Sequence, residues 1–426
     1  MPAQEDGGSA FDATLQRETL GRPDGLESDA ASEREGDVRI TGIECHVLLQ
    51  PDVDVGATSS AQDDIVVEIH TDEGISGLGE SDVNPWIARA CIEARGTHTM
   101  GVGMCEILIG ADPLEVEGLW ERLYVGTAMN GRRGAVINAI GAIDMALHDL
   151  RGKVLGKPCH ELLGGAQVDH ITPYASLQPE VSGFDAYRDS LCVWAVRARE
   201  LGFRAIKTEV TLNGPYAHVG LNEPHERATE VVAAVREAVG PEMTLLVDVQ
   251  YAFPDADTAL RVIRDWGEFD VFFLETPLWP DDLAGHRRLA EEQPIPIASG
   301  EWLTTRHEFA QLMDEGRIGV AQPDIGRVGG LTEARRVCEM AVERGLPVVP
   351  HLWKTGISIA AAAHLAAARR EIRFIEFLPR ELCESGLRRD LTGEELSMVD
   401  GRIAIPQQPG LGVEIDRAAL AHYSVP

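Results

Sequence analysis

The sequence predicts an α/β fold, namely a (β/α)7β TIM-type barrel preceded by an α+β N-terminal capping domain. Two observations support this prediction. From about Ile171 onward, apolar strand-like segments alternate with helical segments. Three of the apolar segments end in an acid, at Asp248, Glu275 and Glu301, which lie 27 and 26 residues apart. A strand, a helix and two short loops fill such an interval, so each acid is expected at the end of one parallel strand.

The region before this alternation has a different pattern. Ile40–Leu49, Ile65–His70 and Gly77–Glu80 are predicted strands. The clearest helix is Ala135–His148, because small and apolar residues cover most of its surface and predict burial between layers. We therefore expect the α+β capping domain to span residues 38–165.

Eight strands joined by seven helices make a closed barrel, which we predict over residues 166–398. Helical patterns fill the intervals, for example Ala228–Val239 and Glu333–Arg344. A final helix is replaced by a C-terminal segment, residues 399–426, which is expected to return to the capping domain. The predicted barrel strands are Ile171–Leu177, Phe203–Val210, Thr244–Gln250, Val271–Leu278, Pro296–Trp302, Gly319–Ile325, Pro347–Trp353 and Phe374–Pro379.

The three strand-end acids predict a metal site. Barrels of this kind place their active sites at the C-terminal ends of the strands, where Asp248, Glu275 and Glu301 would meet. Two carboxylates ~4 Å apart repel by about 4 kcal/mol at an effective dielectric of 20, so three of them need a counter-charge. Hard oxygen ligands suit Mg²⁺, with Mn²⁺ as an alternative. Three unrelated surface acids, the other interpretation, would not explain the repeating interval.

Two further strand ends predict an acid–histidine pair. The sixth strand leads to Asp324 and the seventh to His351. Neighbouring strand ends can place the carboxylate against the imidazole, where it would fix the tautomer and raise the basicity that a general base needs. A lone histidine would be interpreted as a hydrogen-bonded core residue. The matched positions of the two residues favour the catalytic interpretation.

The second and eighth strands add three candidate site residues. Strand alternation puts Lys207 and Glu209 on one side. A lysine in a barrel mouth needs a partner, so Lys207 is a candidate for carboxylate binding or proton transfer, or else forms a buried ion pair without a chemical role. Glu376, at the end of the eighth strand, either hydrogen-bonds the substrate or lies on the rim.

Composition excludes several classes of partner. The formal net charge of −31 argues against nucleic acid and against an anionic membrane surface. No apolar run reaches the length of a membrane span. Only four of the 38 basic residues are lysines, which suits a high-salt cytoplasm or, alternatively, an ordinary acidic mesophile protein.

Cysteine usage and the N-terminus bear on the compartment. The seven cysteines are scattered without a CxxC pair, which fits a reducing cytoplasm. Residues 1–37 are polar and acidic and lack the basic and apolar regions of a secretory signal, so we expect a disordered acidic tail. The chain is therefore predicted to be cytoplasmic.

In this order and spacing, several short segments resemble the mandelate racemase/muconate lactonizing enzyme-like branch of the enolase superfamily. The resemblance covers about Val38 to the C-terminus and is closest to acid-sugar dehydratases. The segments that carry it are Lys207-Thr208-Glu209, Val247-Asp248, Leu274-Glu275-Thr276-Pro277, Gly300-Glu301, Gln322-Pro323-Asp324-Ile325-Gly326-Arg327-Val328-Gly329-Gly330, Pro350-His351, Ala142-Ile143-Asp144-Met145-Ala146-Leu147 and Leu162-Leu163-Gly164-Gly165.

The resemblance implies Mg²⁺ at the three strand-end acids and an Asp324–His351 dyad on one side of the substrate. It also implies that loops of the capping domain cover the site, with 50–62 and 129–133 as candidates. We expect a homo-oligomer acting on a small sugar acid. The shared chemistry of the superfamily is removal of a proton α to a carboxylate, and in dehydratases a β-hydroxyl then leaves.

One residue departs from the family pattern. The second strand usually carries Lys-x-Lys, and the second lysine is the base on the face opposite the histidine; here Glu209 takes that place. We therefore expect His351 to act as a single base, Lys207 to neutralise a carboxylate oxygen, and Glu209 to tune charge and hold Lys207. The product would be a 2-keto-3-deoxy acid. Epimerase or cycloisomerase chemistry is the alternative, and a catalytically silent metal-binding barrel is a more distant one.

Overall fold

The computed structural model describes residues 38–57, 59–179, 181–393 and 396–426, so the predicted acidic tail lies outside the described residues. The N-terminal part of the described chain begins with an antiparallel sheet in the order β1-β2-β3. Its strands are β1 (Ile40–Leu49), β2 (Asp63–Thr71) and β3 (Ser76–Ser81), close to the predicted ranges. Apolar residues on one face of β1 and β2 join the core of this domain.

One long helix packs against that sheet. α4 (Ala135–Leu155) is buried almost all round, as its composition predicts, and it ends at Gly156 in the left-handed conformation. Gly79 allows α4 to approach β3 closely, since a Cβ added at Gly79 would lie 2.0 Å from the Ala142 carbonyl oxygen. On its other side, a Cβ at Gly141 would lie 2.3 Å from the Gly326 carbonyl. The remaining helices of the capping domain are α1 (Pro85–Glu93), α2 (Met104–Leu108), α3 (Val116–Gly126) and α5 (Cys159–Leu162).

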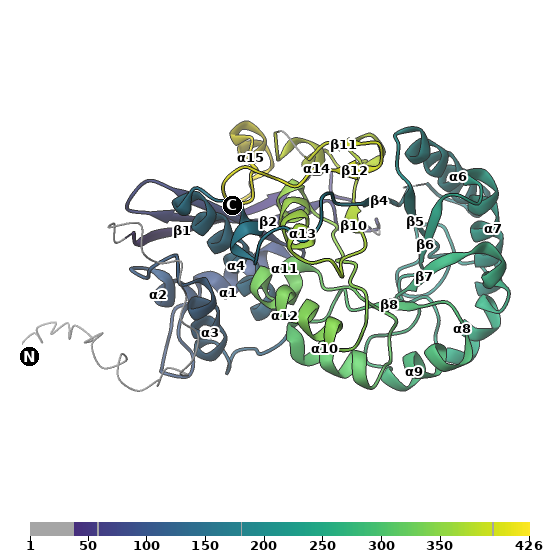
Figure 1. The fold of residues 1–426 in the computed structure, drawn as a ribbon, viewed down its shortest axis with the longest axis horizontal. Helices are drawn as coiled ribbons and strands as arrows, with labels where there is room; N and C mark the ends of the chain where they lie inside the picture. Colours follow the sequence, from purple (N-terminus) through teal and green to yellow (C-terminus); the bar gives the residue numbers. More distant parts are fainter. Residues whose placement is uncertain (1–37, 58, 180, 394–395) are drawn as a thin grey trace, which may run out of the picture. The chain divides into compact units, whose positions relative to one another are not determined.

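A curled parallel sheet follows, in the order β10-β4-β5-β6-β7-β8-β9 (Figure 1). The predicted seventh strand, 347–353, is wrong in extent: only Val348 forms bridges, to Ala321 on one side and Ile372 on the other. These bridges continue the sheet from β9 toward β10. The strands are β4 (Pro173–Leu177), β5 (Ala205–Glu209), β6 (Thr244–Asp248), β7 (Val271–Glu275), β8 (Ile297–Ser299), β9 (Val320–Ala321) and β10 (Ile375–Phe377).

Seven helices connect these positions, as predicted, and Figure 1 shows α6 to α10 outside the ring of strands. They are α6 (Phe184–Glu200), α7 (Ala228–Val239), α8 (Ala256–Ile263), α9 (Leu283–Glu292), α10 (Thr305–Asp314), α12 (Gly330–Glu343) and α13 (Gly356–Ala368), with the single turn α11 (Ile325–Val328) before α12. Short 3₁₀ turns lie at η1 (His225–Arg227), η2 (Trp266–Phe269) and η3 (Arg380–Leu382).

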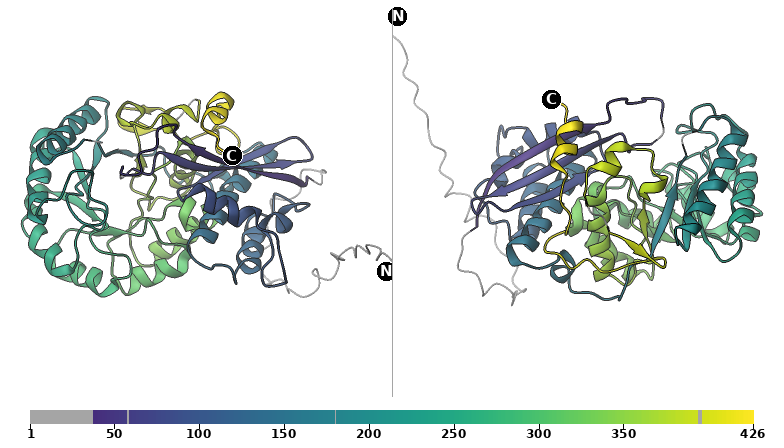
Figure 2. Two further views of the ribbon diagram at one scale, coloured as in Figure 1. Left: turned by 180° about the vertical axis from the view of Figure 1, so that it is seen from behind. Right: turned by 90° about the horizontal axis from the view of Figure 1, so that it is seen from above.

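The chain then runs from the barrel back to the first sheet. The Val425 N–H donates to the Val47 carbonyl at 2.9 Å, and Ser424 bridges Leu48. Helix α15 (Arg417–Tyr423) lies beside β1 in the views of Figures 1 and 2. The preceding elements are α14 (Gly386–Asp390), β11 (Met398–Val399) and β12 (Arg402–Ile403). Within the described residues, no helix combines the length and apolar character needed to cross a membrane.

Inside the barrel, side chains lie in layers because alternate residues of each strand point inward. One apolar layer consists of Tyr174, Ala205, Leu246, Phe273, Ala298, Val320 and Val349. Two residues further along, the strand positions carry Ser176, Lys207, Asp248, Glu275, Gly300, Gln322 and His351. The apolar layer therefore forms the floor beneath a mostly polar layer at the C-terminal ends of the strands.

Candidate active site

The strand-end acids are buried at the barrel mouth. Asp248 pairs in register with Glu275 on one side and Glu209 on the other, and Glu301 follows β8. The Thr276 hydroxyl and the Gln250 N–H donate to Asp248 Oδ1 at 2.7 and 2.9 Å. These bonds to the turns after β6 and β7 fix the orientation of the Asp248 carboxylate.

Lys207 lies among three of the acids. Its Nζ is 2.8 Å from Glu376 Oε1, 2.9 Å from Glu275 Oε1 and 3.9 Å from Asp248 Oδ2. Burial lowers the pKa of Lys207, but the attraction of Glu275 and Glu376 outweighs it and holds that pKa well above the ordinary value. The ammonium is thus a fixed cation in this arrangement. The expected contact with Glu209 is replaced by these three acids.

Asp248 shows how much negative charge collects here. Burial raises its pKa well above the ordinary value, and the repulsion of Glu275 adds to the rise. Glu275 Oε2 is buried without a hydrogen-bond partner. An additional cation would lower the energy of both carboxylates, so their environment fits a divalent metal.

Asp324 and His351 form the predicted pair. His351 Nδ1 lies 2.8 Å from Asp324 Oδ2, and Nε2 lies 3.0 Å from Glu301 Oε2. The Tyr251 hydroxyl donates to the other Glu301 oxygen at 2.7 Å. Burial lowers the pKa of His351, but the attraction of Glu301 and the hydrogen bond with Asp324 outweigh it and raise that pKa to about 9.

Glu209 has its own set of partners, which sequence reasoning missed. Its Oε2 accepts hydrogen bonds from the side-chain amides of Gln178 and Gln250, the latter at 3.0 Å. Its Oε1 accepts from the Thr211 hydroxyl at 3.1 Å and lies 2.7 Å from His218 Nε2. His218 comes from a loop beyond β5, where no strand period marks its direction.

Glu376 does not lie where either interpretation of the sequence put it. It is fully buried, pairs with Lys207, and accepts the Leu352 N–H at 2.8 Å. It is neither a rim residue nor a residue that lines the cavity described below. Its contacts hold the Lys207 side chain in place.

The capping domain adds a residue that the sequence did not single out. Asp82, just after β3, forms ion pairs with Arg327 and, at 3.0 Å, with Lys354. Burial raises the pKa of Asp82, but these two cations outweigh it and lower that pKa to about 2. Lys354 also donates to the Ser60 carbonyl at 2.6 Å, which ties the loop 50–62 to the barrel. The sequence offered one signal for this contact: lysine is scarce in this chain, so Lys354 stands out as a potential partner of an acid.

A cavity of about 190 Å³ opens between these groups. Loop 50–62 reaches it through Ser60, whereas none of the residues 129–133 lines it. Aromatic side chains form one wall, where Tyr251 and Trp302 have ring centroids 4.2 Å apart. The lining residues are Ser60, Ser176, Gln178, Lys207, Glu209, Tyr216, Asp248, Gln250, Tyr251, Glu301, Trp302, Arg327, His351 and Trp353.

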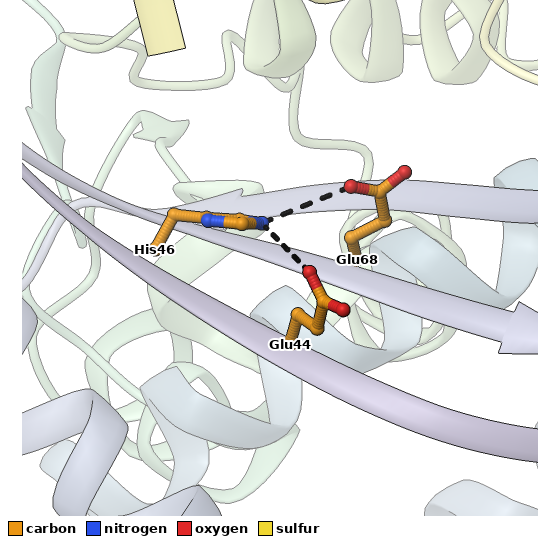
Figure 3. Close-up of side chains that lie close together, drawn as sticks. All are labelled: Glu44, His46 and Glu68. Atoms are coloured by element: carbon orange, nitrogen blue, oxygen red, sulfur yellow. Dashed lines mark ion pairs between the residues drawn. The ribbon is translucent and has the colours of Figure 1, made fainter. Parts of the chain in front are cut away.

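Two groups among the described residues bring potential metal-ligand atoms within 4.8 Å of one another. One is Asp82, Asp324 and His351 at the barrel mouth, and the other is Glu44, His46 and Glu68 on the capping sheet (Figure 3). The predicted ligands Asp248, Glu275 and Glu301 are not one of these groups. Asp248 and Glu275 form ion pairs with Lys207, and Glu301 lies against His351. Their chemistry fits a metal, and their role as its ligands stays a prediction.

The fold and the site together define a two-domain (β/α)-barrel protein with buried acids, a lysine and a histidine around one cavity. Residues 42–164 match the family described as mandelate racemase / muconate lactonizing enzyme, N-terminal domain, and residues 192–419 match the enolase C-terminal domain-like family. The chain belongs to the mandelate racemase/muconate lactonizing enzyme branch of the enolase superfamily.

Relatives span the chain nearly end to end. The D-galactarolactone cycloisomerase of Agrobacterium fabrum is 31% identical, covering 91% of this chain and 100% of that enzyme. The L-rhamnonate dehydratase of Saccharopolyspora erythraea is 32% identical, covering 83% of each chain, and the D-xylonate dehydratase of Haloferax volcanii is 30% identical, covering 85% of each. The crystal structure of the 3,6-anhydro-D-galactonate cycloisomerase from Zobellia galactanivorans superimposes with a TM-score of 0.79 at 30% identity, covering 91% and 100%.

Proposed function

We propose that the protein dehydrates a sugar acid, an aldonate or aldarate, to a 2-keto-3-deoxy acid. The observation that carries this proposal is the cavity in which His351, backed by Asp324, faces the same space as the strand-end acids Asp248 and Glu301. A base and a potential metal site on one cavity are what abstraction of a proton α to a carboxylate requires. Several relatives at about 30% identity are named as sugar-acid dehydratases.

We propose Asp248, Glu275 and Glu301 as the residues that would hold Mg²⁺, with Mn²⁺ as an alternative. The support is their burial, the raised pKa of Asp248, and the unpartnered Glu275 oxygen. When bound, the ion would supply positive charge against the negative charge that develops on the substrate carboxylate. Lys207, which lines the cavity, would neutralise a carboxylate oxygen on the same side.

His351 would carry the proton. Asp324 lies against Nδ1, so Nε2 is the nitrogen that takes the α-proton from the substrate. The carbon–oxygen bond to the β-hydroxyl then breaks, and the protonated imidazole returns its proton to the leaving oxygen, which departs as water. The resulting enol rearranges to the 2-keto-3-deoxy acid. No second base is needed in this sequence of steps.

Cycloisomerase or epimerase chemistry is the second candidate. Glu209 favours it, because its carboxylate lines the cavity from β5, whereas His351 lines it from the segment that follows Val348 on another part of the barrel. A carboxylate there is a potential second proton carrier. The cycloisomerase from Agrobacterium fabrum, which matches along its whole length, points the same way.

A substrate screen separates these candidates. The protein would be incubated with Mg²⁺ and a panel of mono- and diacid sugars and their lactones, and 2-keto acid formation would be measured. We expect a 2-keto acid from at least one open-chain sugar acid, and none with the His351→Asn variant. An isomer of the same mass without 2-keto acid would favour the second candidate. Absence of any product across the panel would contradict both.

We also propose that the protein is a cytoplasmic homo-oligomer. Its capping domain would end near residue 165 and its barrel domain near residue 398. The seven cysteines are all free, which fits a reducing compartment. Large apolar side chains are exposed on α1 and α3 and just after α2, such as Ile87, Val125 and Ile109. Light scattering at micromolar concentration would give the oligomeric state, and a monomer would contradict this part of the proposal.

A further inference from the structure

A group of histidines and glutamates lies on the capping sheet, apart from the residues that line the barrel cavity. Glu44 and His46 alternate along β1, and Glu68 and His70 alternate along β2, so each pair faces one side of its strand. Glu44 is directly opposite Glu68 in the antiparallel register, which places all four residues on the same face. Figure 3 shows the His46 ring pointing toward both the Glu44 and the Glu68 carboxylates.

The distances within this group are too long for hydrogen bonds. His46 Nε2 lies 3.8 Å from Glu44 Oε2 and 3.7 Å from Glu68 Oε2. His70 Nε2 lies 3.6 Å from the other Glu44 oxygen. Two ligand atoms on a tetrahedral ion with bonds of about 2.1 Å would be separated by about 3.4 Å. The observed spacings are therefore close to those across a metal ion.

The two imidazoles supply an independent reason for a ligand. His46 Nε2 and His70 Nε2 are both buried and have no hydrogen-bond partner. Buried polar atoms of this kind are rare in native structures and are commonly explained by an absent water or ion. The two nitrogens approach different oxygens of Glu44, and the ligand atoms that lie within 4.8 Å of one another are those of Glu44, His46 and Glu68, which come from both strands.

The charges also favour a cation. Glu44 and Glu68 are like charges directly across two strands, an arrangement that destabilises a sheet. Arg417, at the start of α15, forms hydrogen bonds with Glu68, donating to its two oxygens at 2.7 and 2.8 Å. Ser76 donates to Glu68 Oε1 at 2.9 Å, so Oε1 accepts two hydrogen bonds, whereas Oε2 keeps a second lone pair. Glu44, more than half exposed, has no such fixed partner among these contacts.

We propose that Glu44, His46 and Glu68 form a binding site for a divalent transition-metal ion such as Zn²⁺, and that His70, beside Glu44, completes it. Two imidazoles and two carboxylates suit Zn²⁺, Co²⁺ and Ni²⁺, whereas Mg²⁺ prefers oxygen ligands alone. The ion would join β1 to β2 near the middle of their pairing, where Arg417 also ties α15 to Glu68. This site is distinct from the proposed Mg²⁺ site and would stabilise the capping domain without entering the reaction.

Co²⁺ titration of the full chain in excess Mg²⁺ tests the proposal, because tetrahedral Co²⁺ has a strong visible absorption. We expect the wild type and the Glu275→Gln variant to give the same spectrum with one Co²⁺ per chain. The double variant His46→Gln/His70→Gln should bind Co²⁺ more weakly by about tenfold or more, since loss of ligand contacts costs metal affinity on this scale. The exposed His98 provides a matched control, and His98→Gln should change nothing.

Thermal unfolding gives a second reading that needs no active enzyme. Zn²⁺ should raise the Tm of the wild type and of Glu275→Gln, but not that of the double variant, whose Tm without metal shows that it is folded. Unchanged Co²⁺ binding in the double variant would overturn the proposal. So would a wild-type protein that shows neither the Co²⁺ spectrum nor a Zn²⁺-dependent Tm, because the cluster would then be an ion-pair network only.

Discussion

The barrel mouth holds two acid–histidine pairs that are built in opposite order. In one, His351 lines the cavity and Asp324 lies behind it, at 2.8 Å. In the other, Glu209 lines the cavity and His218 lies behind it, at 2.7 Å. A carboxylate and an imidazole therefore form both pairs, but one pair presents its imidazole to the cavity and the other presents its carboxylate.

The surroundings of the two pairs differ as well. Burial and the nearby Arg327 lower the pKa of His351, but Glu301, Asp324 and Glu376 outweigh them and raise it to about 9. Glu209 is held by two glutamine amides and a threonine hydroxyl, all of which donate to its oxygens. A pKa of about 9 leaves the imidazole protonated at neutral pH, and it would take up the substrate proton once a cation offsets the charge of Glu301, whereas a carboxylate held by donors is suited to stay in place. The comparison is consistent with the proposed roles, proton transfer for His351 and positioning for Glu209.

Removal of the metal should have the largest effect, because the positive charge proposed to act on the substrate carboxylate would be lost whichever residue abstracts the proton. EDTA should abolish turnover and Mg²⁺ should restore it. Glu275→Gln should weaken Mg²⁺ binding by about tenfold or more. Glu376→Gln is the matched control, since Glu376 also contacts Lys207 but is not a predicted ligand. Calorimetric Mg²⁺ affinities that fall equally in both variants would contradict the ligand assignment.

Changes to the His351 pair should come next in size. His351→Asn should lower kcat by about 10²–10⁴-fold or more, the usual contribution of a general base. Asp324→Asn should have a smaller effect, because the imidazole remains while its tautomer and orientation are no longer fixed. Steady-state kinetics on the substrate found in the screen would measure both. A larger loss of kcat in Asp324→Asn than in His351→Asn would contradict the proposal that His351 is the base and Asp324 its support.

The Glu209 pair should be more tolerant. Glu209→Gln should reduce kcat by less than about tenfold, well below the range expected for a lost base. His218→Gln should change it less still, because His218 does not line the cavity. If Glu209→Gln instead matched His351→Asn in the same assay, the two walls would share the proton transfer, as a two-base epimerase requires.

A third histidine extends the comparison from catalysis to the stability of the fold. Burial lowers the pKa of His364 to about 4, since its Nδ1 accepts the His160 N–H and no carboxylate is in contact. Its unfolded form binds a proton near pH 6.5, so the free energy of unfolding falls as pH drops from about 6.5 to 4. We expect this loss to be about 3 kcal/mol larger in the wild type than in His364→Gln. Parallel pH profiles in urea unfolding would contradict it.

The residues whose positions at the barrel mouth follow from the sequence are those fixed by strand alternation. Asp248, Glu275 and His351 each lie two positions beyond an apolar floor residue, so the period of the strand dictates where they point. His218 and Asp82 were missed because they come from loops, whose direction depends on tertiary packing. Glu376 follows the same period but is drawn inward by Lys207, a contact that links strands far apart in sequence.

Exchange of the substrate α-proton with solvent tests the central claim, that His351 is the single abstracting base, most directly. Substrate would be incubated in D₂O with wild type, His351→Asn and Glu209→Gln, recovered, and examined by proton NMR. We predict that His351→Asn loses both turnover and deuterium incorporation at the α-carbon, while Glu209→Gln retains much of the incorporation. Persistent α-deuteration by His351→Asn, with water elimination lost, would contradict the claim and make Lys207 or Glu209 the base.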